Sequence, residues 1–409
     1  MKILWLAPYP HPLDTAAHPV PWVGTLADLL RQEPSVELTI LNWTPRITTE
    51  IDEFDRDGIH FIYLKVPSVR LDILTLYQRR IAIVREYLRH HYQEYDLLHL
   101  HGSELQLPAM TAGLPVPMLL SVQGIVSEYA KVVPATFSML KFLWTMAGLY
   151  ERRYLPMVKN FSCRTHWDKK HTARLSPGCT IYHNWETIRP EFFAAADEPS
   201  PAQTARLQAL FVGGNQVIKG FKEMLIGYNL IRQKADIKLI IVGRLAPEDV
   251  QQVIQQLNLQ HIGPDDVECR RFQTAAELAA LYRESFCLLH PSYIDNSPNS
   301  VCEAQLVGLP VVASNVGGVS SLITEGETGL LCTLEPETLA QQTLRLYADP
   351  GLHQRISLQA QAEARYRHDP AAIIKRTLAI YDAVRQSFVG PSYPPPALIE
   401  LPLQLQLTH

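Results

Sequence analysis

Two carboxylates flank a predicted helix start in the stretch Leu288–Val319. Asp295 and Glu303 are separated by seven residues, and between them Ser297 is placed to act as the N-cap of a helix that begins with a proline. Gly308 stands where that helix would end. Carboxylate oxygens accept hydrogen bonds, whereas the backbone N–H groups at a helix start attract anions. This combination suits a polyhydroxylated, phosphorylated ligand.

Length and composition limit the class of protein. The chain has 409 residues, which favours two domains, and its net charge of 37 − 41 = −4 argues against a nucleic-acid partner. The six cysteines form no CxxC pair, so we expect no zinc site, no disulfide framework and a reducing compartment. The apolar start, Lys2–Ala7, is too short for a signal peptide, and no run reaches the roughly 18–20 apolar residues that span a bilayer. These features predict a cytoplasmic protein.

Short apolar segments alternate with helical periodicity along the first half of the chain. The segments that read as strands are 2–10, 37–43, 59–66, 95–102, 117–124 and 161–163, and helices are expected over 22–31 and 71–91. Such alternation predicts an α/β fold with parallel strands and helical crossovers, that is, a doubly wound sheet. Ligands bind at the carboxyl ends of the strands in such sheets. The loops 8–21, 101–104 and 123–127 are therefore expected around one crevice.

A second alternating pattern follows a change of composition. Residues 194–206 read as a linker, and strands and helices alternate again from 207 onward. Residues 350–388 are helical by periodicity, and the proline-rich end has no pattern. The predicted parts are an N-terminal domain (1–193), the linker (194–206), a C-terminal domain (207–368), a helix that could cross back to the first domain (369–388), and a disordered tail or docking arm (389–409).

The segment Pro134–Tyr154 is a hydrophobic helix that ends in basic residues. One interpretation is a helix that faces the core. The other is a surface helix that touches a membrane or a lipid-linked acceptor, which would place the protein peripherally at the inner face of the membrane. Both interpretations remain open at this stage.

Six segments of the chain follow one another in a distinctive order. They are LFVGG…KG (210–220), IKLIIVG (237–243), LYRESFCLLHPS (281–292), D-x7-E ending in EA (295–304), GLPVVASNVGG (308–318) and EGETGLL (325–331). Together they resemble retaining glycosyltransferase family 4, strongly over 207–345 and more loosely in the first domain. The resemblance implies the GT-B fold, in which two Rossmann-like domains face each other across a cleft and the second holds the nucleotide-sugar.

The resemblance also implies roles for individual residues. Glu303 matches the acid that accepts hydrogen bonds from the nucleotide ribose, and Asp295 matches the acid near the donor sugar, although it is one methylene shorter. Lys219 matches the lysine that neutralises the departing diphosphate, so Asp295 and Lys219 form the expected catalytic pair. The loop whose backbone faces the donor comprises Asn296, Ser297, Pro298, Asn299 and Ser300. The alternative without a function is that Asp295 and Glu303 are solvated acids at the protein surface.

The chain departs from the family pattern at three positions. Gly214 replaces the usual arginine, and Arg244 could supply the missing charge unless it forms a surface salt bridge. Gln123 stands where many relatives have a histidine, and glutamine cannot act as a base. This is compatible with a front-face displacement in which the leaving phosphate takes the acceptor proton. In the first-domain loop, only Gly24 is expected to let the backbone approach the donor.

His99 and His101 alternate along a predicted strand and should share one face. A metal site would need a third ligand, for which Glu104 is the nearby candidate, but we favour a polar pair at the crevice and expect no metal or other cofactor. His101, Glu104, Gln123 and Arg164 are the residues expected on the acceptor side.

The leading hypothesis is a hexosyl-type glycosyltransferase. It would move a sugar from a nucleotide-sugar to a saccharide or lipid-linked acceptor with retention, in polysaccharide or glycoconjugate synthesis. The alternatives on the same fold are a nucleotide-sugar epimerase and a sugar- or nucleotide-binding protein without turnover. Gln123 argues mildly against the epimerase, which needs acid–base groups at the sugar ring. The joint presence of Lys219, Asp295 and Glu303 argues against a site without turnover.

Overall fold

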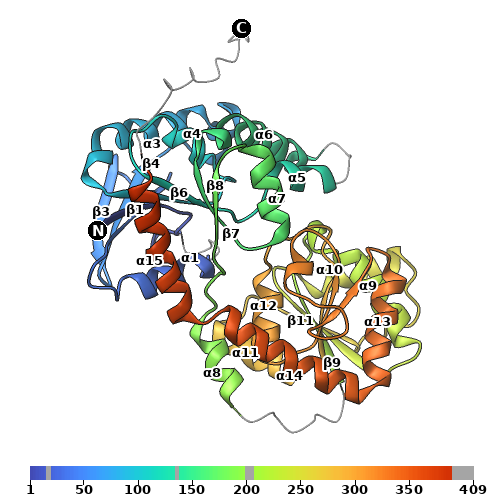
Figure 1. Ribbon diagram of the computed structural model, residues 1–409. Coiled ribbons are helices and arrows are strands. Elements are labelled where there is room, and N and C mark those ends of the chain that lie inside the picture. Colours follow the sequence, from blue (N-terminus) through green and yellow to red (C-terminus); the bar gives the residue numbers. More distant parts are fainter. Residues whose placement is uncertain (15–19, 134–137, 199–206, 389–409) are drawn as a thin grey trace, which may run out of the picture.

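The computed structural model describes residues 1–14, 20–133, 138–198 and 207–388. The predicted tail over 389–409 lies outside the described residues, as do most of the predicted linker and the first residues of the helix predicted over 134–154. The described chain forms two α/β domains, each built on one sheet (Figure 1).

The N-terminal sheet has eight strands in the order β3-β4-β2-β1-β5-β6-β7-β8. Neighbouring strands are parallel except for the edge strand β3, which is antiparallel to β4. The strands are β1 (Lys2–Leu6), β2 (Glu37–Thr44), β3 (Ile51–Arg56), β4 (Ile59–Lys65), β5 (Leu97–His101), β6 (Met118–Ser121), β7 (Asn160–Cys163) and β8 (Thr180–His183). The sequence does not predict β3, because its polar residues are those of a half-exposed edge strand.

Helices cover both faces of this sheet. They are α1 (Pro21–Leu30), α2 (Val69–Leu74), α3 (Gln78–His91), α4 (Leu107–Thr111), α5 (Val126–Val132), α6 (Met139–Tyr154) and α7 (His166–Leu175). Helices α3, α4 and α6 pack on one face and α1 on the other. The single helix predicted over 71–91 is wrong: Leu76 and Tyr77 have positive φ angles and separate α2 from α3. The Tyr150 hydroxyl donates to the Leu76 carbonyl at 2.7 Å, which fixes this break against α6.

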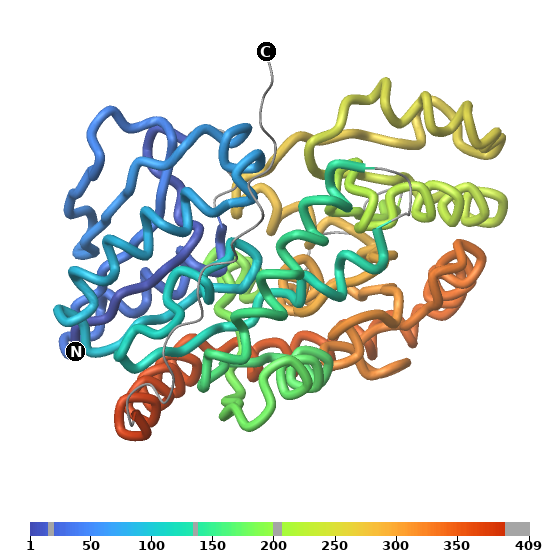
Figure 2. The backbone as a smooth tube through the Cα atoms, turned by 90° about the horizontal axis from the view of Figure 1, so that it is seen from above, coloured from blue at the N-terminus to red at the C-terminus, as the bar shows by residue number. Residues whose placement is uncertain are grey.

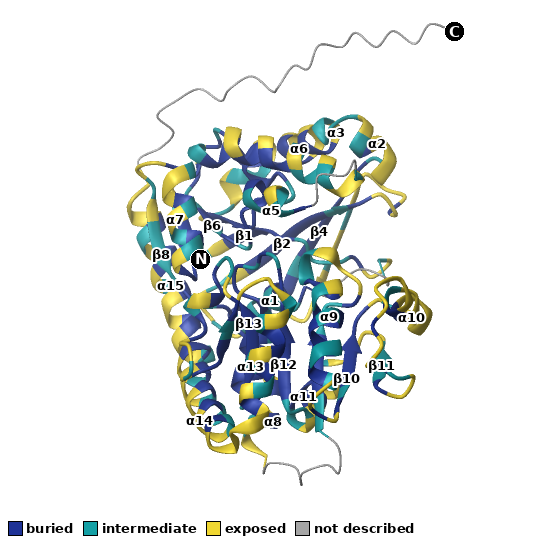
Figure 3. Ribbon diagram, turned by 90° about the vertical axis from the view of Figure 1, so that its right-hand side faces the viewer, coloured by how far each residue is buried: buried dark blue, intermediate teal, exposed yellow. Residues whose placement is uncertain are grey.

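The C-terminal sheet has six parallel strands in the order β11-β10-β9-β12-β13-β14. The strands are β9 (Leu207–Val212), β10 (Ile237–Val242), β11 (Val267–Arg270), β12 (Cys287–His290), β13 (Val311–Ser314) and β14 (Leu330–Cys332). The helices that follow the first domain are α8 (Pro190–Asp197), α9 (Phe221–Arg232), α10 (Pro247–Gln256), α11 (Ala275–Glu284), α12 (Asn299–Leu306), α13 (Pro336–Ala348), α14 (Pro350–Arg367) and α15 (Pro370–Gln386). In both domains the central strands are buried beneath helices that are exposed on their outer sides (Figure 3).

The domain boundary differs from the predicted one at residue 193. Helix α8 packs on α11 and α12, and Phe192 is fully buried in the core of the C-terminal domain. The chain therefore enters the second domain before α8, and residues 194–197 are the end of that helix rather than a linker.

The segment 350–388 consists of two helices, α14 and α15, and α15 confirms the separate helix predicted over 369–388. Asp369 caps α15 by accepting the Ala372 N–H, and Pro370 occupies its first turn. The change of direction carries the chain from the C-terminal domain back onto the N-terminal sheet, where Tyr381 of α15 is buried beside Trp5 of β1. The C-terminal segment thus runs along one side of both domains (Figure 2).

Among the described residues, no helix combines the length and the apolar character that a membrane span requires.

Candidate functional site

Two loops at the carboxyl ends of β9 and β12 form the floor of the candidate site. The loop after β9 ends in Lys219–Gly220, and the Tyr293 N–H in the loop after β12 donates to the Ile218 carbonyl at 2.9 Å. Gly220 has φ +73°, and a Cβ there would lie 2.0 Å from the Pro291 carbonyl oxygen. Glycine at this position therefore lets the two loops pack directly together.

Lys219 and Asp295 form an ion pair across these two loops. Lys219 Nζ lies 2.5 Å from Asp295 Oδ2, and His290 Nε2, from the end of β12, lies 3.4 Å from the same oxygen. Burial alone would raise the pKa of Asp295, but Lys219 and then His290 outweigh it and hold that pKa well below its usual range. Asp295 is therefore a largely enclosed, ionised acid, with its side chain 13% exposed, next to the lysine that is predicted to stabilise the leaving diphosphate.

The helix start differs from the predicted one by one residue. Pro298 is the N-cap of α12 and Asn299 its first residue, so Ser297 does not cap the helix. The Pro298 carbonyl accepts the Val301 and Cys302 N–H groups, which leaves the N–H groups of Asn299 and Ser300 without a partner inside the helix. These two donors remain the ones suited to an anion. The end of the helix is as predicted, with Gly308 at φ +77°.

Glu303 lies one turn further along α12 and is buried. Its Oε1 accepts a hydrogen bond from Arg189 Nη2 at 2.7 Å. Burial raises the pKa of Glu303 to about 7, although Arg189 opposes the shift. Arg189 precedes α8 and is 114 residues away in sequence, so no local pattern could have predicted this pair.

The Asn296 side chain points away from the predicted donor. It lies against the N-terminal domain, where it bonds Thr165, Asp168 and the Gln123 carbonyl. The polar atoms of this side chain are thus engaged with the first domain, whereas the prediction for Asn296 concerns its backbone and stays a prediction.

Gly24 and Arg244 were also predicted to contact the nucleotide-sugar, and the structure places them differently. Gly24 lies inside α1 and its N–H donates to the Val20 carbonyl at 3.2 Å, so this N–H group is already engaged. The close approach of the donor to the backbone at Gly24 stays a prediction. Arg244 follows β10, is exposed and forms no ion pair with any described residue. Its backbone lies against the loop after β9, because a Cβ on Gly214 would be 3.0 Å from the Arg244 nitrogen. Arg244 thus stands beside the loop that carries Lys219.

Three of the four predicted acceptor-side residues line one cavity at the carboxyl ends of β5, β6 and β7. His101, Gln123 and Arg164 share it with Glu186, and its empty volume, open mouth included, is about 470 Å³. Arg164 Nη2 lies 2.7 Å from Glu186 Oε1. Burial raises the pKa of Glu186, against the effects of Arg164 and of a hydrogen bond from Gln123. The sequence gives no signal for Glu186.

Glu104 stands apart from that cavity. A Cβ on Gly124 would lie 3.2 Å from Glu104 Oε1 and 3.1 Å from the Tyr129 ring, so this acid and this tyrosine meet beside Gly124. Burial raises the pKa of Glu104 to about 7.

The two histidines of β5 share a face, as predicted, with ring centroids 4.1 Å apart. His99 Nδ1 lies 2.8 Å from the Tyr381 hydroxyl and Nε2 lies 2.8 Å from Ser121 Oγ, so both nitrogens are engaged. Burial lowers the pKa of His101 well below its ordinary value. The described ranges contain no cluster of three or more side chains suited to a metal ion.

The chain thus has two doubly wound domains whose strand ends face each other. A lysine–aspartate pair lies just before the start of α12. Known proteins are similar to this chain in sequence and in fold. Residues 206–349 match the family model described as glycosyl transferases group 1. The D-inositol 3-phosphate glycosyltransferase of Pseudarthrobacter chlorophenolicus is 33% identical over 153 residues, which cover 36% of this chain and 35% of that protein. The chain thus matches little more than a third of that relative's length.

Solved structures are similar over both domains. Sucrose-phosphate synthase from Thermosynechococcus elongatus superposes with a TM-score of 0.72 at 17% identity, covering 94% of this chain and 98% of that one. HepE from Anabaena, in complex with UDP and glucose, superposes with a TM-score of 0.65 at 16% identity, covering 94% and 100%. The fold of this chain is GT-B, as the resemblance implied, and its C-terminal domain is similar to group 1 glycosyltransferases.

The Lys219–Asp295 pair is expected to stabilise the fold. Lys219→Met leaves a buried carboxylate with His290 as its remaining partner, and we expect a loss of about 1–3 kcal/mol in the free energy of unfolding at pH 7. Because the folded-state pKa of Asp295 is lowered, its stabilisation is present above the ordinary aspartate value and disappears as the pH falls into the acid range. Denaturant unfolding at several pH values measures both effects.

The matched control is Lys222→Met, which changes an exposed lysine three residues further on in α9. Equal midpoints for the two variants at pH 7 would contradict the stabilising role of the pair.

Proposed function

We propose that this protein is a retaining glycosyltransferase that moves a hexose-type sugar from a nucleotide-sugar to a saccharide or lipid-linked hydroxyl in the cytoplasm. The observation that carries the proposal is the Lys219–Asp295 ion pair just before the start of α12, the helix that also carries Glu303, in a domain similar to group 1 glycosyltransferases. The protein would act in polysaccharide or glycoconjugate synthesis and need no cofactor.

The order of these groups matches the parts of a nucleotide-sugar. In this proposal Glu303 accepts hydrogen bonds from the ribose diol, the N–H groups of Asn299 and Ser300 bind the diphosphate, and Asp295 contacts the sugar. Lys219 and the exposed Arg244 supply positive charge for the diphosphate. The UDP bound to HepE supports a uridine nucleotide as the first donor to test.

The proposed step is a front-face displacement. The acceptor oxygen forms a bond to the anomeric carbon while the bond from that carbon to the diphosphate oxygen breaks. The acceptor proton passes to the departing diphosphate, and Lys219 stabilises its charge. Gln123, which cannot take a proton, is assigned the orientation of a hydroxyl group.

A donor panel tests the function. Uridine-, guanosine- and thymidine-diphosphate sugars are screened by thermal shift with the full chain, and each binder is incubated with saccharide and lipid-linked acceptors. We expect at least one donor to bind and its sugar to be transferred with the anomeric configuration kept, as read by NMR of the product. Epimer formation without transfer, or binding without turnover of any acceptor, would contradict the proposal.

Donor binding is expected to depend on pH through Glu303. With a pKa of about 7, this acid is mostly protonated at pH 6 and mostly ionised at pH 8, and only the ionised carboxyl accepts hydrogen bonds through both oxygens. The affinity for a nucleotide-sugar should therefore rise about tenfold from pH 6 to pH 8. A nucleotide-sugar has no phosphate group that titrates in this interval, so it is preferable to the free nucleotide as a probe.

Glu303→Gln is the control for this profile, since its side chain cannot ionise. The groups that face Glu303 are Arg189, Tyr282 and Glu191, and they are unchanged in the variant. A variant profile as steep as that of wild type would remove Glu303 from the ribose site.

We further propose that the exposed face of α6 meets the membrane when the acceptor is lipid-linked. Met139, Phe142 and Leu149 are 65%, 46% and 48% exposed on this face, and the helix ends in the exposed pair Arg152–Arg153. Trp144 does not belong to this face, because its ring packs edge-on against Tyr129 at 5.8 Å between centroids.

Flotation with anionic vesicles measures this contact. We expect Phe142→Ser/Leu149→Ser to lower the vesicle-bound fraction severalfold, since two large apolar side chains no longer enter the interface. Leu358→Ser, at a 61% exposed position on α14, is the control. Equal flotation of all three proteins would exclude α6 as the contact.

A further inference from the structure

The loop that carries Asp295 and leads into α12, residues 295–300, is called the donor loop. Asn296 is its residue whose side chain bonds the N-terminal domain. Its side chain is 1% exposed, and each of its polar atoms has a partner across the domain interface. Oδ1 accepts from Thr165 Oγ1 at 2.6 Å, and Nδ2 donates to Asp168 Oδ2 at 2.9 Å and to the Gln123 carbonyl at 3.2 Å. These partners lie more than 120 residues away in the sequence.

Two of the three partners of Asn296, Thr165 and Asp168, belong to the capping box at the start of α7. Thr165 is the N-cap and Asp168 the third residue of a capping box, and the two Asp168 oxygens accept the Arg164 and Thr165 N–H groups. The carboxylate is fully buried without a cationic partner, so the amide of Asn296 completes its set of hydrogen-bond donors. An asparagine fits because it donates to the carboxylate and accepts from the hydroxyl at once.

The backbone around this contact is shaped for close approach. A Cβ on Gly318 would lie 2.6 Å from both Thr165 Oγ1 and Cγ2 and 2.1 Å from the Asn296 carbonyl oxygen. The Gly318 N–H donates to the Asp295 carbonyl at 2.8 Å, so the same turn supports the residue next to Asn296. The interface is therefore packed directly on the donor loop.

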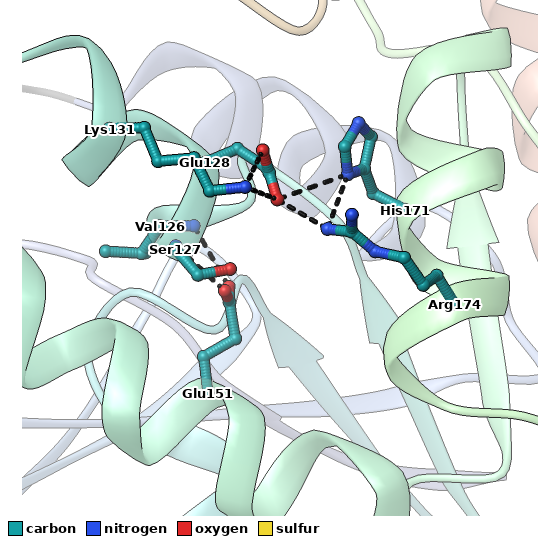
Figure 4. Close-up of polar contacts among 7 residues, drawn as sticks. All are labelled: Val126, Ser127, Glu128, Lys131, Glu151, His171 and Arg174. Carbon is teal, nitrogen blue, oxygen red and sulfur yellow. Dashed lines mark hydrogen bonds and ion pairs between the residues drawn. The ribbon is translucent and has the colours of Figure 1, made fainter.

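The opposing face of the N-terminal domain is rigidly held (Figure 4). Glu151 of α6 accepts the Val126 and Ser127 N–H groups at 3.0 and 2.9 Å, which ties the start of α5 to α6. On the other side of α5, Glu128 pairs with Arg174 of α7 at 2.5 Å. Polar contacts thus join α5 to α6 and to the last turn of α7.

We propose that Asn296 is a positioning residue that couples contact between the two domains to the placement of Asp295 against the donor sugar. When the domains meet, the capping box of α7 binds Asn296 and fixes the loop in which Asp295 is the preceding residue. When they separate, Asn296 loses three partners and the loop loses its support on one side. This inference rests on the proposed function for its consequence at Asp295, but the contact itself is independent of any donor.

The test compares wild type, Asn296→Ala and the exchanged pair Asn296→Asp/Asp168→Asn. Asn296→Ala is expected to increase the radius of gyration in small-angle X-ray scattering without any ligand. It should also weaken nucleotide-sugar binding about tenfold, because buried polar groups lose their partners. Asn296→Asp alone places two carboxylates face to face and should behave like the alanine variant. The exchanged pair restores an amide–carboxylate contact with its direction reversed and should recover part of both losses.

Ser321→Ala is the matched control at the same interface. Ser321 Oγ accepts the His166 N–H at 3.0 Å, and this hydroxyl makes no hydrogen bond to Asp295 or Asn296 among the described residues, so donor affinity should be unchanged. A wild-type radius of gyration for Asn296→Ala, or unchanged nucleotide-sugar affinity in that variant, would overturn the coupling. If wild type bound no nucleotide-sugar, the proposed function would fail, while scattering would still decide whether Asn296 joins the domains.

Discussion

The partial burial of the Asp295 carboxylate is the constraint on which the arrangement of the two loops depends. A charge removed from water is tolerated only when partners surround it, and here Lys219 comes from the loop after β9 and His290 from the end of β12. Strands β9 and β12 are neighbours in the sheet, so their carboxyl ends bring these groups together. The close approach permitted by Gly220 then fixes the distance between the two loops.

The loop that carries Asp295 also depends on the other domain. Asn296 points into the capping box of α7, while Asp295 points to Lys219, so consecutive side chains of one loop are held by different domains. The chain itself crosses between the domains twice, before α8 and after α14, and both crossings lie on the same side (Figure 1).

Predictions of secondary structure were confirmed where adjacent residues decide the conformation. The buried strands and the end of α12 at Gly308 were predictable, because apolar runs and a left-handed glycine are properties of adjacent residues. The break at Leu76–Tyr77 and the packing of α8 on the second domain were not, since each is decided by contacts with distant helices. Gly24 shows the same limit, because the sequence shows a glycine but does not show that its N–H group is already bonded within α1.

The sequence by itself determined the α/β class, the two-domain organisation and the pair of acids at a helix start. It also carries the resemblance to a glycosyltransferase family from which the roles of Lys219, Asp295 and Glu303 were predicted. Only the tertiary structure decided what these groups touch: His290 beside Asp295, Arg189 on Glu303, and Thr165 with Asp168 around Asn296. The physical reason is that periodicity and turn chemistry act over a few residues, whereas a buried charge or amide takes its partners from wherever the fold brings donors and acceptors within about 3 Å.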